Sequence, residues 1–151
     1  DISALASLPV LRRVHLSNCA TLMDLTPLPL CELLEELDVS YNSMLVDITP
    51  LGRCQKLREV DLSGSRKLTD ISPLARCKSL RTLHLVRCAQ LMDVSPLGCC
   101  GSLTALALSR CAQLSDISPL ASCTALRVLN LCRCTKIVDV SPLAGCQGLK
   151  E

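Results

Sequence analysis

LRTLHLVRCAQL, residues 80–91, carries the strongest structural signal in the sequence. Across Leu83-His84-Leu85 the apolar residues alternate with a polar one, which is the pattern of a short strand with one buried face. The two leucines are predicted to face a core and His84 to face away from it. Variants of this stretch recur along the whole chain, so the sequence predicts a repeat architecture.

The repeat has one constant period and no insertion. An aspartate marks the start of every unit, at positions 1, 24, 47, 70, 93, 116 and 139. The sequence therefore predicts six full repeats, at 1–23, 24–46, 47–69, 70–92, 93–115 and 116–138, and a partial seventh at 139–151. We expect residues 1–151 to form one fragment of a solenoid without capping repeats.

A compact return connects each strand to the next. Proline at positions 27, 50, 73, 96, 119 and 142 excludes one long helix. In Asp70-Ile71-Ser72-Pro73-Leu74 we expect Ser72 to cap the first turn, with Pro73 at a position that needs no N–H. The space left accommodates only one or two turns of 3-10 or α-helix.

These elements predict an α/β solenoid. Identical strands joined by a return on one side stack in parallel, roughly 4.8 Å apart, into a sheet on the concave side. The short helical turns then lie on the convex side. Phe and Trp are absent, so we expect aliphatic and thiol side chains to fill a narrow core.

The pattern LxxLxLxxCxxL resembles the leucine-rich-repeat family over the whole chain. The DISPL segment resembles the repeats of internalin-like proteins, whose unit is one residue shorter and has Asn where this chain mostly has Cys. The unit LxLSxCxxLxDISPLAxC is closer to the cysteine-bearing repeats of kinetoplastid protists. This resemblance implies a leucine-rich-repeat solenoid that binds other proteins.

The twelve cysteines fall mostly into two positions of the repeat. One position is shared with Asn42 and Ser65, and the other with Leu8, so the cysteine behaves as a small packing residue. We expect buried, reduced thiols, and in the first position thiols that satisfy backbone groups as Asn does. This predicts an intracellular protein, cytoplasmic or cytoskeleton-associated. Disulfides and a secreted fold remain the alternative.

No metal or cofactor site is predicted. Cys132-x-Cys134 and Cys99-Cys100 lack a second pair at zinc-finger spacing. The aspartates at the start of the units could bind Ca²⁺, but one carboxylate per unit supplies too few ligands. We expect each of them to accept hydrogen bonds from backbone N–H groups of the turn that follows. Catalytic residues are not predicted either, because His15 and His84 lie three units apart.

Four sets of residues are expected to project from the concave face. They begin at Arg13, His15, Ser17 and Asn18 and recur once in every unit. The charged residues among these sets fall into two groups of opposite sign, which we call the acidic patch and the arginine row. The acidic patch is Glu36, Asp38, Glu59 and Asp61, and the arginine row is Arg87, Arg110 and Arg133. Tyr41, the only aromatic residue, is the candidate hot spot beside the acidic patch, and His84 completes the predicted binding residues.

The sequence thus predicts a non-enzymatic scaffold that binds a protein on its concave face. An extracellular adhesin is the first alternative, favoured by the internalin-like segment. Phosphate or nucleic-acid binding through the arginine row is the second, although the net charge of +2 and the missing aromatic platforms argue against it. No apolar run is long enough to cross a membrane. End-to-end self-association through uncapped ends is a further expectation.

Overall fold

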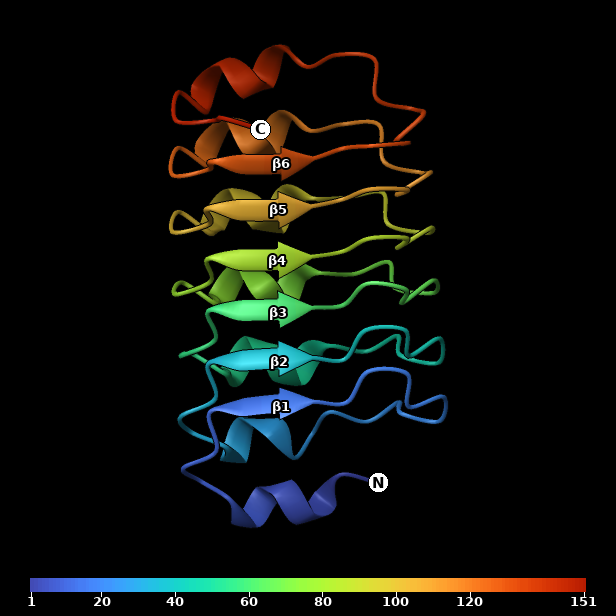
Figure 1. The fold of residues 1–151 in the computed structure, drawn as a ribbon, viewed down its shortest axis with the longest axis vertical. Helices are drawn as coiled ribbons and strands as arrows, with labels where there is room; N and C mark the ends of the chain where they lie inside the picture. Colours follow the sequence, from blue (N-terminus) through green and yellow to red (C-terminus); the bar gives the residue numbers. More distant parts are fainter.

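The computed structural model describes residues 1–151 as a stack of six coils, each with one 3-10 helix and one short strand, followed by a seventh 3-10 helix (Figure 1). The six strands pair in sequence order and all in parallel. Every strand residue lies opposite its equivalent in the next unit, as Leu37 does with Val60. The strands are β1 (Arg13–His15), β2 (Glu36–Asp38), β3 (Glu59–Asp61), β4 (Thr82–His84), β5 (Ala105–Ala107) and β6 (Val128–Asn130).

The returns are 3-10 helices, within the range that the sequence predicted. Figure 1 shows them behind the sheet, stacked like the strands. They are η1 (Ser3–Ser7), η2 (Leu28–Leu30), η3 (Thr49–Arg53), η4 (Ser72–Arg76), η5 (Ser95–Cys99), η6 (Ser118–Ser122) and η7 (Ser141–Gly145). No helix in the chain is both long and apolar enough to cross a membrane.

The predicted serine cap is wrong. Ser72 is the first residue of η4 and Ile71 holds the cap position, with no side-chain cap bond. The backbone N–H of Ser72 instead donates to Oδ1 of Asp70, at 2.7 Å. The aspartate that begins each of the seven units makes the same bond, at 2.7 to 2.8 Å, to the residue two positions on. The side chain of an aspartate is short enough to accept a hydrogen bond from the backbone N–H two residues further on. The prediction that these aspartates bond to the turn that follows them is therefore confirmed.

One continuous core of 38 buried apolar residues runs through the stack. The middle residue of each strand points into it, whereas the two flanking residues point out, as in Thr82-Leu83-His84. Leu83 and Leu85 are both fully buried. Each strand therefore contributes one side chain to the core. The space between the sheet and the helices is narrow, so aliphatic residues fill it and large aromatic ones do not.

Nine of the twelve cysteines are buried and none is bonded to another. In the position shared with Asn42, the Sγ–H groups of Cys88, Cys111 and Cys134 donate to the carbonyl oxygens of Leu62, Leu85 and Leu108, at 3.0 to 3.5 Å. Asn42 makes two such bonds, to Leu16 and Val39. The prediction that cysteine thiols at the strand ends bond to backbone groups, as Asn does at the same position, is confirmed.

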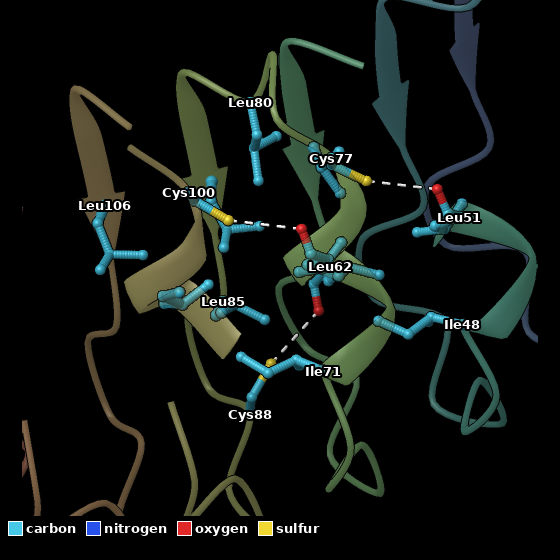
Figure 2. Close-up of a cluster of buried hydrophobic side chains, with 14 of the residues drawn as sticks. Ile48, Leu51, Leu62, Ile71, Cys77, Leu80, Leu85, Cys88, Cys100 and Leu106 are labelled. Carbon is cyan, nitrogen blue, oxygen red and sulfur yellow. Dashed lines mark hydrogen bonds between the residues drawn. The ribbon is translucent and has the colours of Figure 1, made fainter. Parts of the chain in front are cut away.

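A second thiol ladder runs along the ends of the helices. Cys77 and Cys100 donate to the carbonyl oxygens of Leu51 and Leu74, at 3.3 and 3.4 Å (Figure 2). In both ladders the acceptor lies 26 residues earlier, in the preceding coil. The thiols therefore join neighbouring coils, each as a second donor to a carbonyl oxygen that also accepts a backbone N–H of its own turn, as Leu51 does from Cys54 and Leu62 from Ser65.

Burial also changes the acidity of the thiols. It raises the pKa of Cys54, Cys88 and Cys111 to about 12. The pKa of Cys77, Cys100 and Cys123 rises to about 11 for the same reason. A thiolate would lose both its hydration and the hydrogen bond that the thiol donates, so the core requires protonated cysteines.

Candidate functional site

The exposed face of the sheet, called the concave face here, carries the residues that the core does not use. The first and third residues of each strand project from it because the middle residue points inward. The parallel register places Glu36 opposite Glu59 and Asp38 opposite Asp61. The four carboxylates of the acidic patch thus lie together on β2 and β3. Like charges on neighbouring strands are unfavourable for the fold, so packing alone does not account for them.

Part of the acidic patch is neutralised within the chain. Glu36 contacts Arg13 at 3.3 Å and His15 at 3.1 Å. The neighbouring Glu35 pairs with Arg12 and, at 3.8 Å, with Arg58. All these groups are at least partly exposed, and such pairs contribute little to stability. Glu59 has no ion pair and is the least compensated carboxylate of the acidic patch.

The two aspartates of the acidic patch also have a structural role. Oδ1 of Asp38 accepts the backbone N–H of Ser40 at 2.8 Å, and Oδ1 of Asp61 accepts that of Ser63 at 2.7 Å. Asn130 makes the same bond to Cys132 at 2.9 Å, without a charge. The turn therefore needs a side-chain oxygen at this position, and the negative charge of the aspartates is left for contacts outside the chain.

The set of positions that begins at Ser17 was predicted to project, and two of its members do not. Ser40 and Ser63 are 4% and 5% exposed. Oγ of Ser63 accepts the backbone N–H of Val86 in the next coil at 3.1 Å. The chain turns at this point, so the serines lie under the turn rather than on the face. The predicted contact surface is narrower there than the sequence suggested.

Tyr41 and Gly64 form a pair at the ends of β2 and β3. Both have left-handed backbones, with φ of 57° and 77°. A Cβ on Gly64 would lie 2.8 Å from Cδ1 of Tyr41, which shows that the tyrosine ring lies against the glycine backbone. About half of the tyrosine side chain stays exposed. The ring is therefore held in one place beside the acidic patch, as an anchor residue requires.

The arginine row occupies the same left-handed position in the last three coils. Arg87, Arg110 and Arg133 have φ of 62°, 64° and 62°, a conformation that Gly and Asn adopt at lower cost. Asn18 and Gly64 stand at this position elsewhere in the chain. None of the three arginines takes part in an ion pair. Strain combined with a free charge is typical of residues retained for a contact.

Beside the arginine row, on β4 to β6, the concave face is neutral. His84 is half-buried on β4, next to Ala107 on β5. Ala105 on β5 lies beside Val128 on β6, whose side chain is 40% exposed. The structure thus places acidic residues on coils 2 and 3 (24–69), and free arginines on coils 4 to 6 (70–138), where the neutral strand residues of β4 to β6 lie beside them.

A second charged surface was missed by the sequence analysis. Six exposed cations lie where the helices lead into the strands of coils 3 and 4. They are Arg53, Lys56, Arg58, Arg76, Lys78 and Arg81. Arg53 and Arg76 hold equivalent places in successive units, as do Arg58 and Arg81. This spacing is visible in the sequence, but the six residues lie outside the strands, where the L-x-L pattern does not indicate which side chains project.

The two histidines lie apart, and no cluster of metal-ligating side chains forms. No set of three or more His, Cys, Asp or Glu side chains is placed to hold an ion. His15 and His84 belong to β1 and β4, with β2 and β3 between them. One open depression on the helix side is lined by Thr49, Gly52, Ser72, Pro73 and Arg76.

Comparisons with solved structures give the same fold. Internalin C2 from Listeria monocytogenes is 28% identical with a TM-score of 0.69, covering 96% of this chain and 71% of that one. InlF, an internalin from the same bacterium, is 23% identical with a TM-score of 0.56, covering 99% and 63%. A leucine-rich-repeat protein of Leptospira interrogans is 13% identical with a TM-score of 0.66, covering 99% of this chain and 44% of that one. The last two show similarity of fold alone.

Comparison with sequence families is more direct. No curated protein sequence matches the chain. The family described as leucine-rich repeats in two copies matches residues 32–76 and again residues 101–145. These two matches cover more than half of the 151 residues. With the parallel sheet, the 3-10 returns and the internalin-like repeats, they show that the chain belongs to the leucine-rich-repeat family.

Proposed function

We propose that the chain is a non-enzymatic scaffold that binds a partner protein on its concave face. Leucine-rich-repeat folds generally mediate protein–protein interactions, and solenoids present extended surfaces for them. The observation that carries the proposal is the arginine row. Three consecutive coils place an unpaired arginine at a left-handed position that Asn or Gly fills at lower cost.

The acidic patch supports the same face from the other end. Glu59 is unpaired, and Asp38 and Asp61 each use one carboxylate oxygen for the turn. The fixed ring of Tyr41 beside them offers apolar contact at little entropic cost, because its position is already restricted by Gly64. A partner that satisfies these groups has basic residues over coils 2 and 3, and acidic residues over coils 4 to 6.

The chain itself provides substitutions that remove charge and keep the fold. Asp38→Asn with Asp61→Asn retains the oxygen that Asn130 uses at the same position. Arg110→Asn with Arg133→Asn places at the left-handed position the residue already present as Asn18. We expect the second pair to raise the free energy of unfolding by roughly 0.5 to 1 kcal/mol per site.

The experiment compares proximity labelling in cells by the wild type and by these two double variants. A control variant, Arg53→Asn with Lys78→Asn, removes two charges away from the concave face. The proposal expects a common set of labelled proteins for the wild type and the control, reduced at least fivefold by both concave variants. If both concave variants label the same proteins as the wild type, concave-face binding is wrong.

We also propose that the protein resides in a reducing, intracellular compartment. All twelve cysteines are unpaired, and the buried ones donate hydrogen bonds as protonated thiols. An extracellular adhesin is the competing location, supported by the internalin neighbours. Intact-mass measurement after denaturing alkylation of protein from its native source separates the two. Twelve alkylated thiols support the intracellular location, and pairs protected from alkylation contradict it.

A further inference from the structure

We infer that one occupant of the concave face is a second copy of this chain, held by the acidic patch of each copy against the arginine row of the other. The inference rests on the proposed use of the concave face for protein binding, and it names a partner for that face. It follows from the arrangement of charge on the sheet, from the neutral strand residues beside the arginine row and from the two-fold symmetry of a dimer.

The charge on the concave face is divided along the stack. The acidic patch lies on β2 and β3, whereas the concave face of coils 4 to 6 has no carboxylate at all. Coils 4 to 6 contain eight cations and three carboxylates, and the carboxylates are turn aspartates. Coils 1 to 3 contain seven cations and nine carboxylates. The two halves therefore attract each other but cannot meet within one rigid stack.

A surface with one acidic and one basic region is complementary to itself. A two-fold axis that lies in the plane of the face, midway between the regions, brings each region of one copy onto the opposite region of the other. Every favourable contact then occurs twice. Glu59, which has no partner within the chain, would face Arg110 of the second copy, and Arg110 would face Glu59 of that copy.

The relative position of the two charged regions sets the orientation of such a dimer. The acidic residues stand on the strands, and the arginines stand just after the strand ends. The line joining the two regions is therefore oblique to the strands, and so is the axis. The sheets would cross at a large angle, which is one of the two common ways in which sheets pack. The axis passes the neutral part of the face, where Ala107 and His84 oppose no charge.

The size of the face sets the strength of the pair. Six strands at about 4.8 Å and some five residues at about 3.3 Å give a footprint of roughly 24 by 17 Å. This is at or below the lower limit for stable interfaces. We therefore expect a weak dimer, with a dissociation constant in the range of tens to hundreds of micromolar, that dissociates in high salt because its main attraction is electrostatic.

Sedimentation velocity from 10 to 500 μM, at 20 mM and 500 mM NaCl, tests the inference with single charge reversals. The wild type should dimerise at low salt and become monomeric at high salt. Glu59→Arg and Arg110→Glu should each weaken dimerisation at least tenfold. An equimolar mixture of the two variants should recover dimerisation, since the cation introduced in one variant faces the carboxylate introduced in the other. A double variant with both changes should dimerise with itself for the same reason. Arg53→Glu, away from the face, is the control and should behave as the wild type.

Three results would overturn the inference. They are a wild type that stays monomeric throughout the concentration range, a dimer insensitive to Glu59→Arg and Arg110→Glu, and a mixture that does not recover association. End-to-end association gives the second result, because the ends of the stack carry neither residue. A monomeric wild type whose cellular partners are still lost in the concave variants would refute self-association and leave the proposed function intact. Dimerisation that the mixture of charge-reversed variants recovers, with cellular partners that the concave variants do not affect, would support self-association and refute the binding of another protein on this face.

Discussion

The two thiol ladders make the protein sensitive to alkaline pH. Six buried cysteines have a pKa raised by burial to about 11 or 12, from an ordinary value of 9.0. Below pH 9 both the folded and the unfolded chain hold these protons, so the contribution of the thiols to stability is fully present. Between pH 9 and 11 the unfolded chain releases protons that the folded chain keeps, and the free energy of unfolding falls.

The magnitude follows from the size of the shifts. At pH 10 an unfolded thiol with a pKa of 9 is mostly ionised, so each buried thiol lowers the free energy of unfolding by roughly 1 kcal/mol relative to neutral pH. Neighbouring thiols of a ladder raise one another's pKa, so the contributions are coupled, and together they remove several kcal/mol, a large part of the stability of a small domain. We therefore expect the protein to unfold near pH 10.

Urea unfolding followed by circular dichroism at pH 7 to 10.5, with thiolate absorbance at 240 nm recorded in parallel, measures this loss. Cys111→Ser should make the fall in the free energy of unfolding between pH 9 and 11 smaller, by roughly 1 kcal/mol per pH unit. Replacing the exposed cysteines, Cys19, Cys99 and Cys132, by Ser should leave the slope unchanged. Absorbance showing most of the twelve thiols ionised at pH 9.5, with the urea midpoint unmoved, would refute this reasoning.

Further predictions concern single positions. Brief alkylation at pH 7.5 without denaturant should label three of the twelve cysteines, and mass spectrometry showing label on Cys88 or Cys111 would contradict the burial. Ser65→Cys should raise the free energy of unfolding by about 1 kcal/mol in urea titrations, because the buried Oγ of Ser65 has no hydrogen-bond partner; an unchanged or lower value would count against this. Gly64→Ala should lower it by more than about 1 kcal/mol, because of its φ of 77° and the contact with Tyr41; a variant as stable as the wild type would show that the ring moves freely. Hydrogen bonds from the Ser95 side chain and backbone lower the pKa of Asp93, so its stabilisation is present above pH 4 and is lost as the pH falls through its folded pKa. Asp93→Asn should flatten the acid limb of a stability titration, and an unchanged limb would exclude this role.

The repeat by itself determined most of the fold. A strict, insertion-free period with one L-x-L per unit leaves a parallel stack as the solution that buries every leucine. Proline at a fixed place in the return limited the helix to a short turn, and the structure has 3-10 helices there. The exchange of Cys for Asn at the strand ends indicated a hydrogen-bonding thiol, which Cys88 and Cys111 are.

The positions of charge and strain were harder to predict. The repeat placed Glu36 and Asp61 correctly on neighbouring strands, but it gave no sign that Glu36 contacts His15 or that Asp61 closes a turn. The left-handed position was hidden by the arginines, although Asn18 and Gly64 at the same place in other units were a signal for it. Arg53 and Arg76 lie in the returns, where the alternation of the strands says nothing about which side chains are exposed.

The physical reason for this division is the range of the interactions. The signals for strands and turns, alternation and proline, lie within about ten positions of each other, so a periodic sequence shows them directly. The thiol of Cys77, the hydroxyl of Ser63 and the ring of Tyr41 find their partners one coil away, at separations of 23 to 26 residues. Those contacts depend on how closely and at what angle the coils stack, and only the packed structure sets both.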